Sequence, residues 1–333
     1  MIPPGMVMLM SHRPARAAGL AVAALILMGC ASTMPTPAAG HGPERPTITV
    51  GTLPIVDVAP IHLAIEEGYF ADEGLTVEVE VTQGGAAAIP ALISGDLDIA
   101  YGAWPSFLRA NAEGLALRAV ADGTRARPGF TELLAMPGSG LEGDPAGLAG
   151  RRIAVNTLGN IGELAVRAAL VRSGLPADAA ELIEIPFPEM TVALERGDVD
   201  VIWASEPAAT LARDALGAVL VTDSYVEEME AFPVAGYQAT ADFVAANPRT
   251  VAAFTRALER AVRRLTEDPG LAATLAPSFT NLEPDLAERV AMPEFRARLD
   301  VADLARVQER LLEFGMLEAP LDLDALVGPG RLR

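Results

Sequence analysis

The chain contains no lysine and a single cysteine. All 25 of its basic residues are arginines, they face 44 acidic residues, and the net charge is -19. This excess of negative charge disfavours a nucleic-acid partner, because the phosphate backbone would be repelled. Cys30 is the only cysteine, so the sequence excludes an intrachain disulfide, a cysteine metal cluster and an internal thiol nucleophile.

Histidine is almost as scarce, with three residues in the whole chain. His12 and His41 lie in the N-terminal region, which leaves His62 for the folded part. A Ser-His-Asp triad would depend on His62 alone, and one histidine cannot build a metal cluster. No phosphate-binding glycine-rich loop is present either. The sequence therefore predicts no cofactor and no metal, with His62 as a helix-face residue; a cleft role beside Asp57 is the alternative.

The N-terminus has the pattern of a bacterial export signal. Arg13 and Arg16 precede an apolar run over residues 17–28, which is too short to span a bilayer. The run ends in the letters LMGC, which resemble a lipobox whose cysteine becomes lipidated. We therefore expect residues 1–29 to be removed and Cys30 to carry a lipid; cleavage elsewhere, with an incidental cysteine, is the alternative.

Residues 30–46 are rich in Pro, Ala, Gly and Thr and have no apolar periodicity. This composition predicts a flexible tether. Together with the lipobox it predicts an exported protein anchored by lipid to the extracytoplasmic face of the cell membrane.

One ten-residue pattern, which we call the repeated phrase, occurs twice in the sequence. GDLDIAYGAW occupies residues 95–104, and GDVDVIWASE occupies residues 197–206. In each copy we expect the glycine to cap a helix and a short apolar strand to follow. Asp96, Asp98, Asp198 and Asp200 then lie in the turn and at the strand entry as solvated or backbone-capping groups; paired catalytic carboxylates are the alternative. The repetition predicts two similar structural units.

Apolar periodicity alternates between strand and helix through both units. This order predicts an α/β fold in which each unit is a mostly parallel sheet flanked by helices. After residue 231 the pattern becomes helical. The expected strands are 47–51, 75–81, 97–101, 151–155, 182–185 and 199–203, and the expected helices are 60–67, 86–94, 107–113, 161–173, 190–196, 240–246 and 249–267.

Several segments in order resemble a known family: residues 57–77 (DVAPIHLAIEEGYFADEGLTV), 148–155, 193–200 and 206–207. They are similar to solute-binding proteins of ABC importers, in the group that binds nitrate, sulfonates, taurine or thiamine-pyrimidine precursors. The resemblance implies a two-lobed periplasmic-binding-protein-like fold of type II, with residues 47–134 plus 237–333 in lobe 1 and 135–236 in lobe 2. It further implies hinge closure around a small molecule, a monomer, and docking on a membrane permease.

In open α/β sheets ligands bind beyond the carboxyl ends of strands. Five segments follow such ends: 53–60, 83–86, 101–106, 156–161 and 203–206. Plain turns and ordinary helix capping are the alternatives for the Gly-Gly pair and the Asn-rich segment. The candidate ligand-binding residues are Asp57, Ala59, Gly84, Gly85, Tyr101, Gly102, Trp104, Asn156, Thr157, Gly159, Asn160, Trp203, Glu206 and Tyr237.

The character of these residues predicts the ligand class. The aromatic side chains would stack on a flat molecule, with core packing as the alternative. Glu206 would favour an N–H donor, and none of the five segments contains Arg or Lys. We therefore predict a neutral or weakly basic heteroaromatic, such as a pyrimidine vitamin precursor. Backbone N–H groups could instead hold nitrate, bicarbonate or a sulfonate.

Two further classes of function compete with import. Some relatives implied by the resemblance synthesise a pyrimidine from their own histidine and require a cysteine-rich segment, which this chain lacks. A surface sensory module is the other class, and it would show no ligand-dependent stabilisation.

Overall fold

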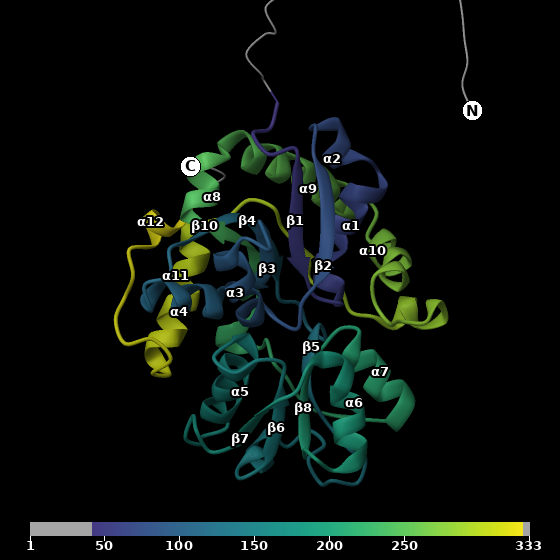
Figure 1. The fold of residues 1–333 in the computed structure, drawn as a ribbon. Coiled ribbons are helices and arrows are strands. Elements are labelled where there is room, and N and C mark those ends of the chain that lie inside the picture. Colours follow the sequence, from purple (N-terminus) through teal and green to yellow (C-terminus); the bar gives the residue numbers. More distant parts are fainter. Residues whose placement is uncertain (1–41, 329–333) are drawn as a thin grey trace, which may run out of the picture. The chain divides into compact units, whose positions relative to one another are not determined.

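Two β-sheets organise the part of the chain that the computed structural model describes, residues 42–328 (Figure 1). The predicted signal segment 1–29, the lipidation site Cys30 and the tether up to residue 41 lie outside the described residues. Within the described part, every helix is too short or too polar to span a bilayer. The two-lobed α/β fold that the sequence predicts is confirmed.

The first sheet forms lobe 1 and has the strand order β11-β4-β10-β3-β1-β2. β1 pairs in parallel with β2 and β3, whereas β10 runs antiparallel between β3 and β4. The sheet is thus mixed rather than mostly parallel. Its strands are β1 (Thr47–Thr52), β2 (Thr76–Val81), β3 (Ile99–Ala103), β4 (Leu117–Arg125), β10 (Pro233–Thr240) and β11 (Glu294–Phe295).

The second sheet forms lobe 2 and has the order β7-β6-β8-β5-β9. β6 is parallel to β7 and β8, and β5 is antiparallel to β8 and β9. The parallel half of each sheet comes from the strand–helix–strand units that the repeat predicted. The strands are β5 (Thr131–Ala135), β6 (Arg152–Val155), β7 (Glu181–Glu184), β8 (Val201–Ser205) and β9 (Val219–Asp223).

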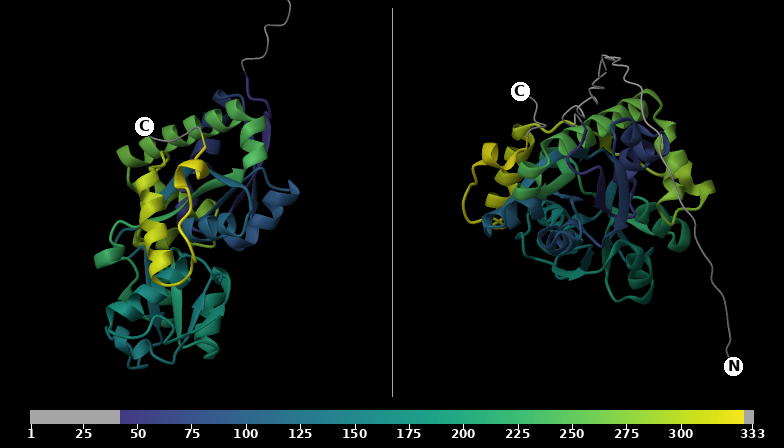
Figure 2. Two further views of the ribbon diagram at one scale, coloured as in Figure 1. Left: turned by 90° about the vertical axis from the view of Figure 1, so that its left-hand side faces the viewer. Right: turned by 45° about the horizontal axis from the view of Figure 1, so that its top comes forward.

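Helices cover both sheets (Figures 1 and 2). In lobe 1, α9 packs on α1 and α2, and α11 packs on α4 and β10. Lobe 1 has α1 (Ala59–Glu66), α2 (Tyr69–Asp72), α3 (Gly85–Ser94), α4 (Trp104–Ala112), α8 (Ala241–Ala246), α9 (Pro248–Glu267), α10 (Gly270–Leu275), α11 (Val301–Glu313) and α12 (Leu323–Leu326); lobe 2 has α5 (Ile161–Arg172), α6 (Phe187–Arg196) and α7 (Ala208–Leu216).

The repeated phrase has the same local structure in both lobes. Gly95 and Gly197 end α3 and α6 with φ values of 83° and 72°, a conformation that glycine adopts without strain. Oδ2 of Asp98 accepts a hydrogen bond from the N–H of Thr49 (3.0 Å), and Oδ2 of Asp200 accepts one from the N–H of Arg152 (2.9 Å). These two aspartates therefore tie neighbouring strands together, which confirms the backbone-capping role for Asp98 and Asp200; Asp96 and Asp198 are exposed.

Three sequence predictions about segment limits need correction. The chain passes between the sheets at residues 126–130 and 224–232, because β5 pairs in the second sheet and β10 in the first. The strands of lobe 2 therefore begin at Thr131, four residues before the predicted limit of 135, and end at Asp223, thirteen residues before the predicted limit of 236. The prediction that helices follow residue 231 missed β10, whose Ala, Gly and Gln residues have weak strand preference.

The predicted tether also ends too late. Residues 42–46 are bound to lobe 1: the Glu44 carboxylate accepts hydrogen bonds from the N–H groups of Arg249 and Thr250 (both 2.9 Å) at the start of α9. Arg45 forms an ion pair with Asp98 (2.8 Å). Glu44 thus satisfies free N–H groups at the α9 N-terminus, which its negative charge also favours.

Candidate functional site

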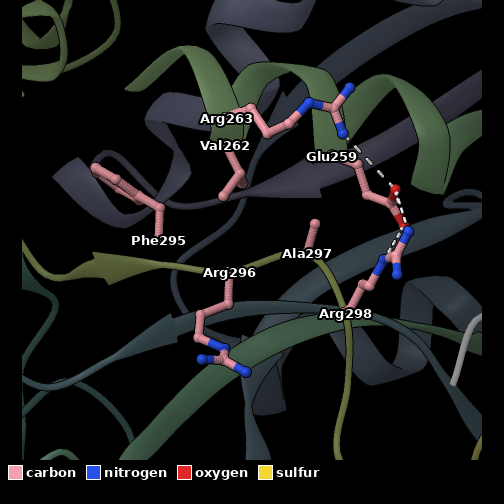
Figure 3. Close-up of a pocket in the computed structure, with 7 residues that line it drawn as sticks. All are labelled: Glu259, Val262, Arg263, Phe295, Arg296, Ala297 and Arg298. Atoms are coloured by element: carbon pink, nitrogen blue, oxygen red, sulfur yellow. Dashed lines mark hydrogen bonds and ion pairs between the residues drawn. The ribbon is translucent and has the colours of Figure 1, made fainter. Parts of the chain in front are cut away.

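A surface pocket of about 470 Å³ lies on lobe 1 between α9 and the segment that follows β11 (Figure 3). Its arginines face acids: Arg298 pairs with Glu259 (2.9 Å), and Arg296 pairs with Asp122 (3.4 Å) and Glu294 (3.1 Å). Because these charges are already paired and only one lobe contributes, this pocket gives no basis for ligand-driven closure.

A narrower cavity lies between the two lobes. All five segments that the sequence singled out contribute to it, from strand ends in both sheets. Its free volume is about 30 Å³, far below the few hundred Å³ of typical ligand pockets. The lining residues are Leu53, Ile55, Asp57, Gly85, Tyr101, Gly102, Ala103, Thr131, Asn156, Asn160, Ile161, Phe187, Trp203, Ser205, Val234 and Ala235.

Half of the predicted site residues line this cavity: Asp57, Gly85, Tyr101, Gly102, Asn156, Asn160 and Trp203. The others lie outside the lining: Ala59, Gly84, Trp104, Thr157, Gly159, Glu206 and Tyr237. Trp104 and Tyr237 are buried in lobe 1, where Tyr237 packs edge-on against Tyr101 and Phe254. For these two aromatics, core packing is the correct alternative.

Asp57 is the charged residue of the cavity. Its Oδ2 accepts hydrogen bonds from Tyr101 Oη and Thr124 Oγ1, both at 3.1 Å. Its Oδ1 is buried without a hydrogen-bond partner among the described residues. Burial raises the pKa of Asp57 to about 6, even though the two hydrogen bonds favour the ionised form. One oxygen of a buried carboxylate is thus available to accept a donor.

Two more polar groups of the cavity have no partner among the described residues. They are Oδ1 of Asn156 and the indole Nε1 of Trp203. Buried polar groups ordinarily make hydrogen bonds, because an unpaired group loses its bonds to water without replacement. The Trp203 ring also packs against Phe187, with ring centroids 5.7 Å apart. The cavity therefore combines two acceptors and one donor with aromatic surfaces.

Helices α3, α5 and α6 each begin with a residue that lines the cavity: Gly85, Ile161 and Phe187. No side chain caps these helix starts. Their N–H groups add weak positive potential, which suits an acceptor on the ligand. No Arg or Lys lines the cavity.

Sequence reasoning missed Phe187. The internal repeat contained the signal for it, because Phe187 opens α6 as Gly85 opens α3, at the same spacing that separates the two glycine caps. The remaining lining residues that were missed are aliphatic, apart from Thr131 and Ser205, whose hydroxyls hydrogen-bond to each other (3.3 Å).

Glu206 joins the two lobes and does not line the cavity. Its carboxylate accepts hydrogen bonds from the N–H and hydroxyl of Thr210 (3.0 Å each) and from the N–H of Ala291 (3.4 Å), on the lobe 1 side. Its carbonyl accepts from the N–H of Val56 (3.3 Å). Burial raises the pKa of Glu206 to about 7. Asp57 is therefore the carboxylate that lines the cavity, and Glu206 forms hydrogen bonds that join the two lobes.

Other predicted residues also meet across the lobes. The Ser106 hydroxyl donates to Oδ1 of Asn160 (3.3 Å). A Cβ on Gly84 would lie 2.4 Å from Oγ1 of Thr157, so the lobes touch there. Asp214 and Arg289 form an ion pair across the same boundary (2.7 Å). These contacts describe an arrangement in which the two lobes are closed on each other.

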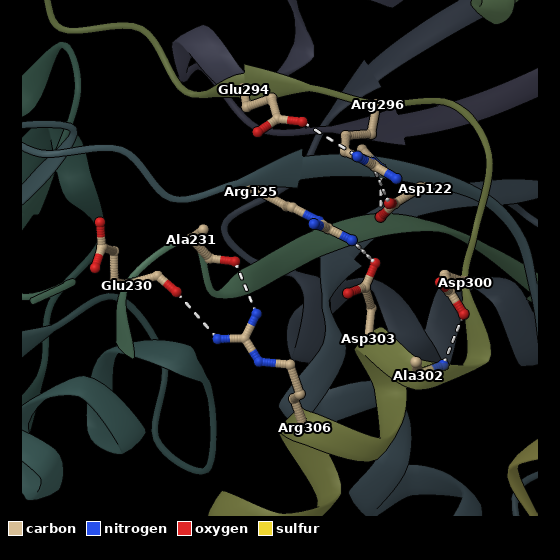
Figure 4. A network of polar contacts seen from close by, with 11 residues as sticks. Asp122, Arg125, Glu230, Ala231, Glu294, Arg296, Asp300, Ala302, Asp303 and Arg306 are labelled. Atoms are coloured by element: carbon tan, nitrogen blue, oxygen red, sulfur yellow. Dashed lines mark hydrogen bonds and ion pairs between the residues drawn. The ribbon is translucent and has the colours of Figure 1, made fainter. Parts of the chain in front are cut away.

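The segments that cross between the lobes are anchored by α11 (Figure 4). Arg306 donates to the carbonyls of Glu230 and Ala231 (3.0 Å each) in the second crossing. Asp303 pairs with Arg125 at the end of β4, where the first crossing begins. Both crossings are thus attached to one helix, which suits a hinge whose movement is restricted to a few residues.

We expect the stability of the ligand-free protein to fall as the pH rises from 5 to 8. Burial raises the pKa values of Asp57, Asp122 and Glu206 to about 6, 7 and 7. The folded state thus binds these protons more tightly than the unfolded state does. The stabilisation is complete below about pH 4 and is lost as the pH passes through 6 to 7, on the order of 3 kcal/mol per group.

Thermal unfolding across this pH range measures the slope. Glu206→Gln removes one titrating group and is expected to flatten it, whereas Glu283→Gln, which changes an exposed carboxylate, is the matched control. A melting temperature that rises from pH 5 to 8 would contradict the assigned pKa shifts.

The chain is similar to known proteins in sequence and in fold. A family model described as "NMT1/THI5 like" matches residues 55–272. The chain belongs to the NMT1/THI5-like family. A related protein named 4-amino-5-hydroxymethyl-2-methylpyrimidine phosphate synthase, from Aspergillus parasiticus, is 24% identical over 282 residues, covering 80% of each chain.

Two solved structures with a similar fold are binding proteins. The alkanesulfonate-binding protein SsuA of Xanthomonas axonopodis pv. citri, bound to MOPS, has a TM-score of 0.73 at 18% identity, over 85% of this chain and 98% of the other. The periplasmic nitrate-binding protein NrtA of Synechocystis PCC 6803 has a TM-score of 0.72 at 15% identity, over 86% and 87%. These likenesses show a shared periplasmic-binding-protein fold.

Proposed function

We propose that this protein is the extracytoplasmic, lipid-anchored solute-binding component of an ABC importer. Its ligand is a neutral or weakly basic flat heteroaromatic with N–H donors, such as a pyrimidine precursor of a vitamin. The observation that carries this proposal is Asp57: a buried carboxylate with an unpartnered Oδ1, on a residue that lines a cavity without Arg or Lys in its lining. The fold and the family membership support the importer class.

An aminopyrimidine complements the polar groups of the cavity. Its amino group would donate to Asp57 Oδ1 or Asn156 Oδ1, and a ring nitrogen would accept from Trp203 Nε1 or from a helix N-terminus. Trp203 and Phe187 provide aromatic surface for the ring. Nitrate and sulfonates offer only acceptors and negative charge. Burying such an anion beside the Asp57 carboxylate would cost more free energy than its interaction with the helix N-termini would supply.

The anion alternative has a specific basis in the three uncapped helix starts. A pyrimidine-synthesising enzyme is the alternative from another class, suggested by the Aspergillus relative. Such an enzyme would need a histidine at the cavity if it made the pyrimidine from its own side chain. Here His62 stacks on Phe279, with ring centroids 4.2 Å apart, and lies outside the cavity lining.

A thermal-shift and calorimetry screen of the purified full-length protein tests the proposal. We expect 4-amino-5-hydroxymethyl-2-methylpyrimidine or a related heteroaromatic to raise the melting temperature and to be recovered chemically unchanged. Nitrate, bicarbonate and alkyl or aryl sulfonates are expected to have no effect at equal concentration. A response to the anions alone would overturn the ligand class, and consumption of the ligand would overturn the binding-protein assignment.

A further inference from the structure

A second, larger hollow opens beside the interlobe cavity. Its volume is about 320 Å³, and it lies between α6 and α7 of lobe 2 and the β1–α1 and 281–286 segments of lobe 1. Ile55 and Phe187 line both the cavity and this hollow, which we call the side groove. Ile55 and Phe187 thus separate the two spaces, and a ligand that occupied both would have to pass between these two side chains.

The side groove is largely apolar. Pro54, Pro188, Leu211 and Leu286 contribute to its surface. Its charged lining residues are Asp214 and Glu283, and Asp214 is paired with Arg289. The groove therefore favours an apolar group and disfavours one that ends in an anion.

The volumes of the cavity and the side groove also favour a ligand that occupies both. The cavity alone, at about 30 Å³, is much smaller than usual ligand pockets, whereas the side groove, at about 320 Å³, falls within their range. The polar groups that orient a ligand are in the cavity, and the apolar area is in the groove. This division matches a molecule with a polar flat ring at one end and an apolar substituent at the other.

We propose that the ligand is a heteroaromatic that carries an apolar arm, with the ring held at Asp57 and Trp203 and the arm passing between Ile55 and Phe187 into the side groove. This inference rests on the proposed heteroaromatic function. It specifies the ligand as larger than a simple pyrimidine, and it assigns the groove as a second subsite that sets chain length. The arm is uncharged or ends in a cation near Glu283.

A series of 4-aminopyrimidines with 5-methyl, 5-propyl, 5-pentyl and 5-benzyl groups tests the subsite by calorimetry with the full-length protein. Affinity is expected to rise about fourfold per buried methylene until the groove is full. A pentyl chain ending in carboxylate is expected to lose this gain.

Two variants locate the arm. Leu211→Gln makes the groove more polar, and Ala215→Trp partly fills it from an exposed position on α7. Both are expected to bind the 5-methyl probe as the parent does and to lose most of the gain for the 5-pentyl probe. Unchanged circular dichroism and melting temperature show that each variant is folded.

The outcomes separate the two proposals. If the 5-methyl probe binds but longer chains bring no gain, or if both variants keep the gain, the side groove is not a subsite while the cavity assignment stands. If no heteroaromatic binds at all, the proposed function fails, and this inference fails with it.

Discussion

Asp57→Asn is expected to weaken binding of an aminopyrimidine about 10- to 100-fold and, at pH 8, to raise the melting temperature of the ligand-free protein. Hydrogen bonds to a charged group contribute about 1.5–3 kcal/mol, which sets the loss of affinity. The gain in stability has a separate cause: the carboxylate is buried with Oδ1 unpaired, which raises its pKa to about 6 and makes its ionised form costly at pH 8.

The same residue predicts how affinity depends on pH. Below about pH 6 Asp57 holds a proton in the free protein, so a neutral ligand that donates to Oδ1 must displace it. Affinity is expected to fall by up to about tenfold per pH unit below that value and to be level above it. In Asp57→Asn the dependence should disappear.

Calorimetry at pH 5, 6, 7 and 8 measures both effects, with Asp96→Asn as the control because Asp96 is exposed on the same lobe. An Asp57→Asn protein that binds as tightly as the parent would remove Asp57 from the site. Equal losses in both variants would point to the general charge of the protein instead.

Gly85→Ala is expected to destabilise the protein by about 3 kcal/mol, or about 5–10 °C in melting temperature, and to abolish measurable binding. A Cβ at Gly85 would lie 2.6 Å from Cα of Gly102 and 3.0 Å from the backbone nitrogen of Ala103. These are backbone atoms of β3 and its end, which cannot turn aside as a flexible side chain could. The start of α3 would therefore move away from β3 and deform the cavity wall.

Gly270→Ala is the matched control, because the nearest atom to an added Cβ is Oδ1 of Asp268 at 3.8 Å. It should change the melting temperature by no more than about 2 °C. If Gly85→Ala unfolds like the parent and binds normally, the close packing of α3 on β3 is not required for the site. A loss of binding at normal stability would still assign the wall to the site.

The sequence predicted the elements that the repeat contains with good accuracy. Alternating apolar periods fixed β1, β2, α3 and β3, and again β6, α5, β7, α6 and β8, because each strand and helix there buries one face against its neighbours. The antiparallel strands were not predicted. β10 lies between β3 and β4, which are far from it in sequence. Pairing with these two strands holds β10 in an extended conformation that several of its own residues do not favour.

Which side chains line the cavity depended on their exact position within the repeated pattern. Tyr101 and Ala103, and in the second copy Trp203 and Ser205, occupy equivalent places in the repeated phrase, and all four line the cavity. Trp104 and Glu206 are the next equivalent pair, and neither lines it.

By itself, then, the sequence determined that two α/β units are present, that five segments follow strand ends, and that few groups for catalysis exist. The tertiary structure decided which carboxylate lines the cavity. Thr210, one turn along α7, and Ala291 from the other lobe engage Glu206, whereas Asp57 keeps one oxygen free. Neither partner is adjacent to Glu206 in sequence. Only the folded chain could therefore show that the Glu206 carboxylate bonds between the lobes and does not line the cavity.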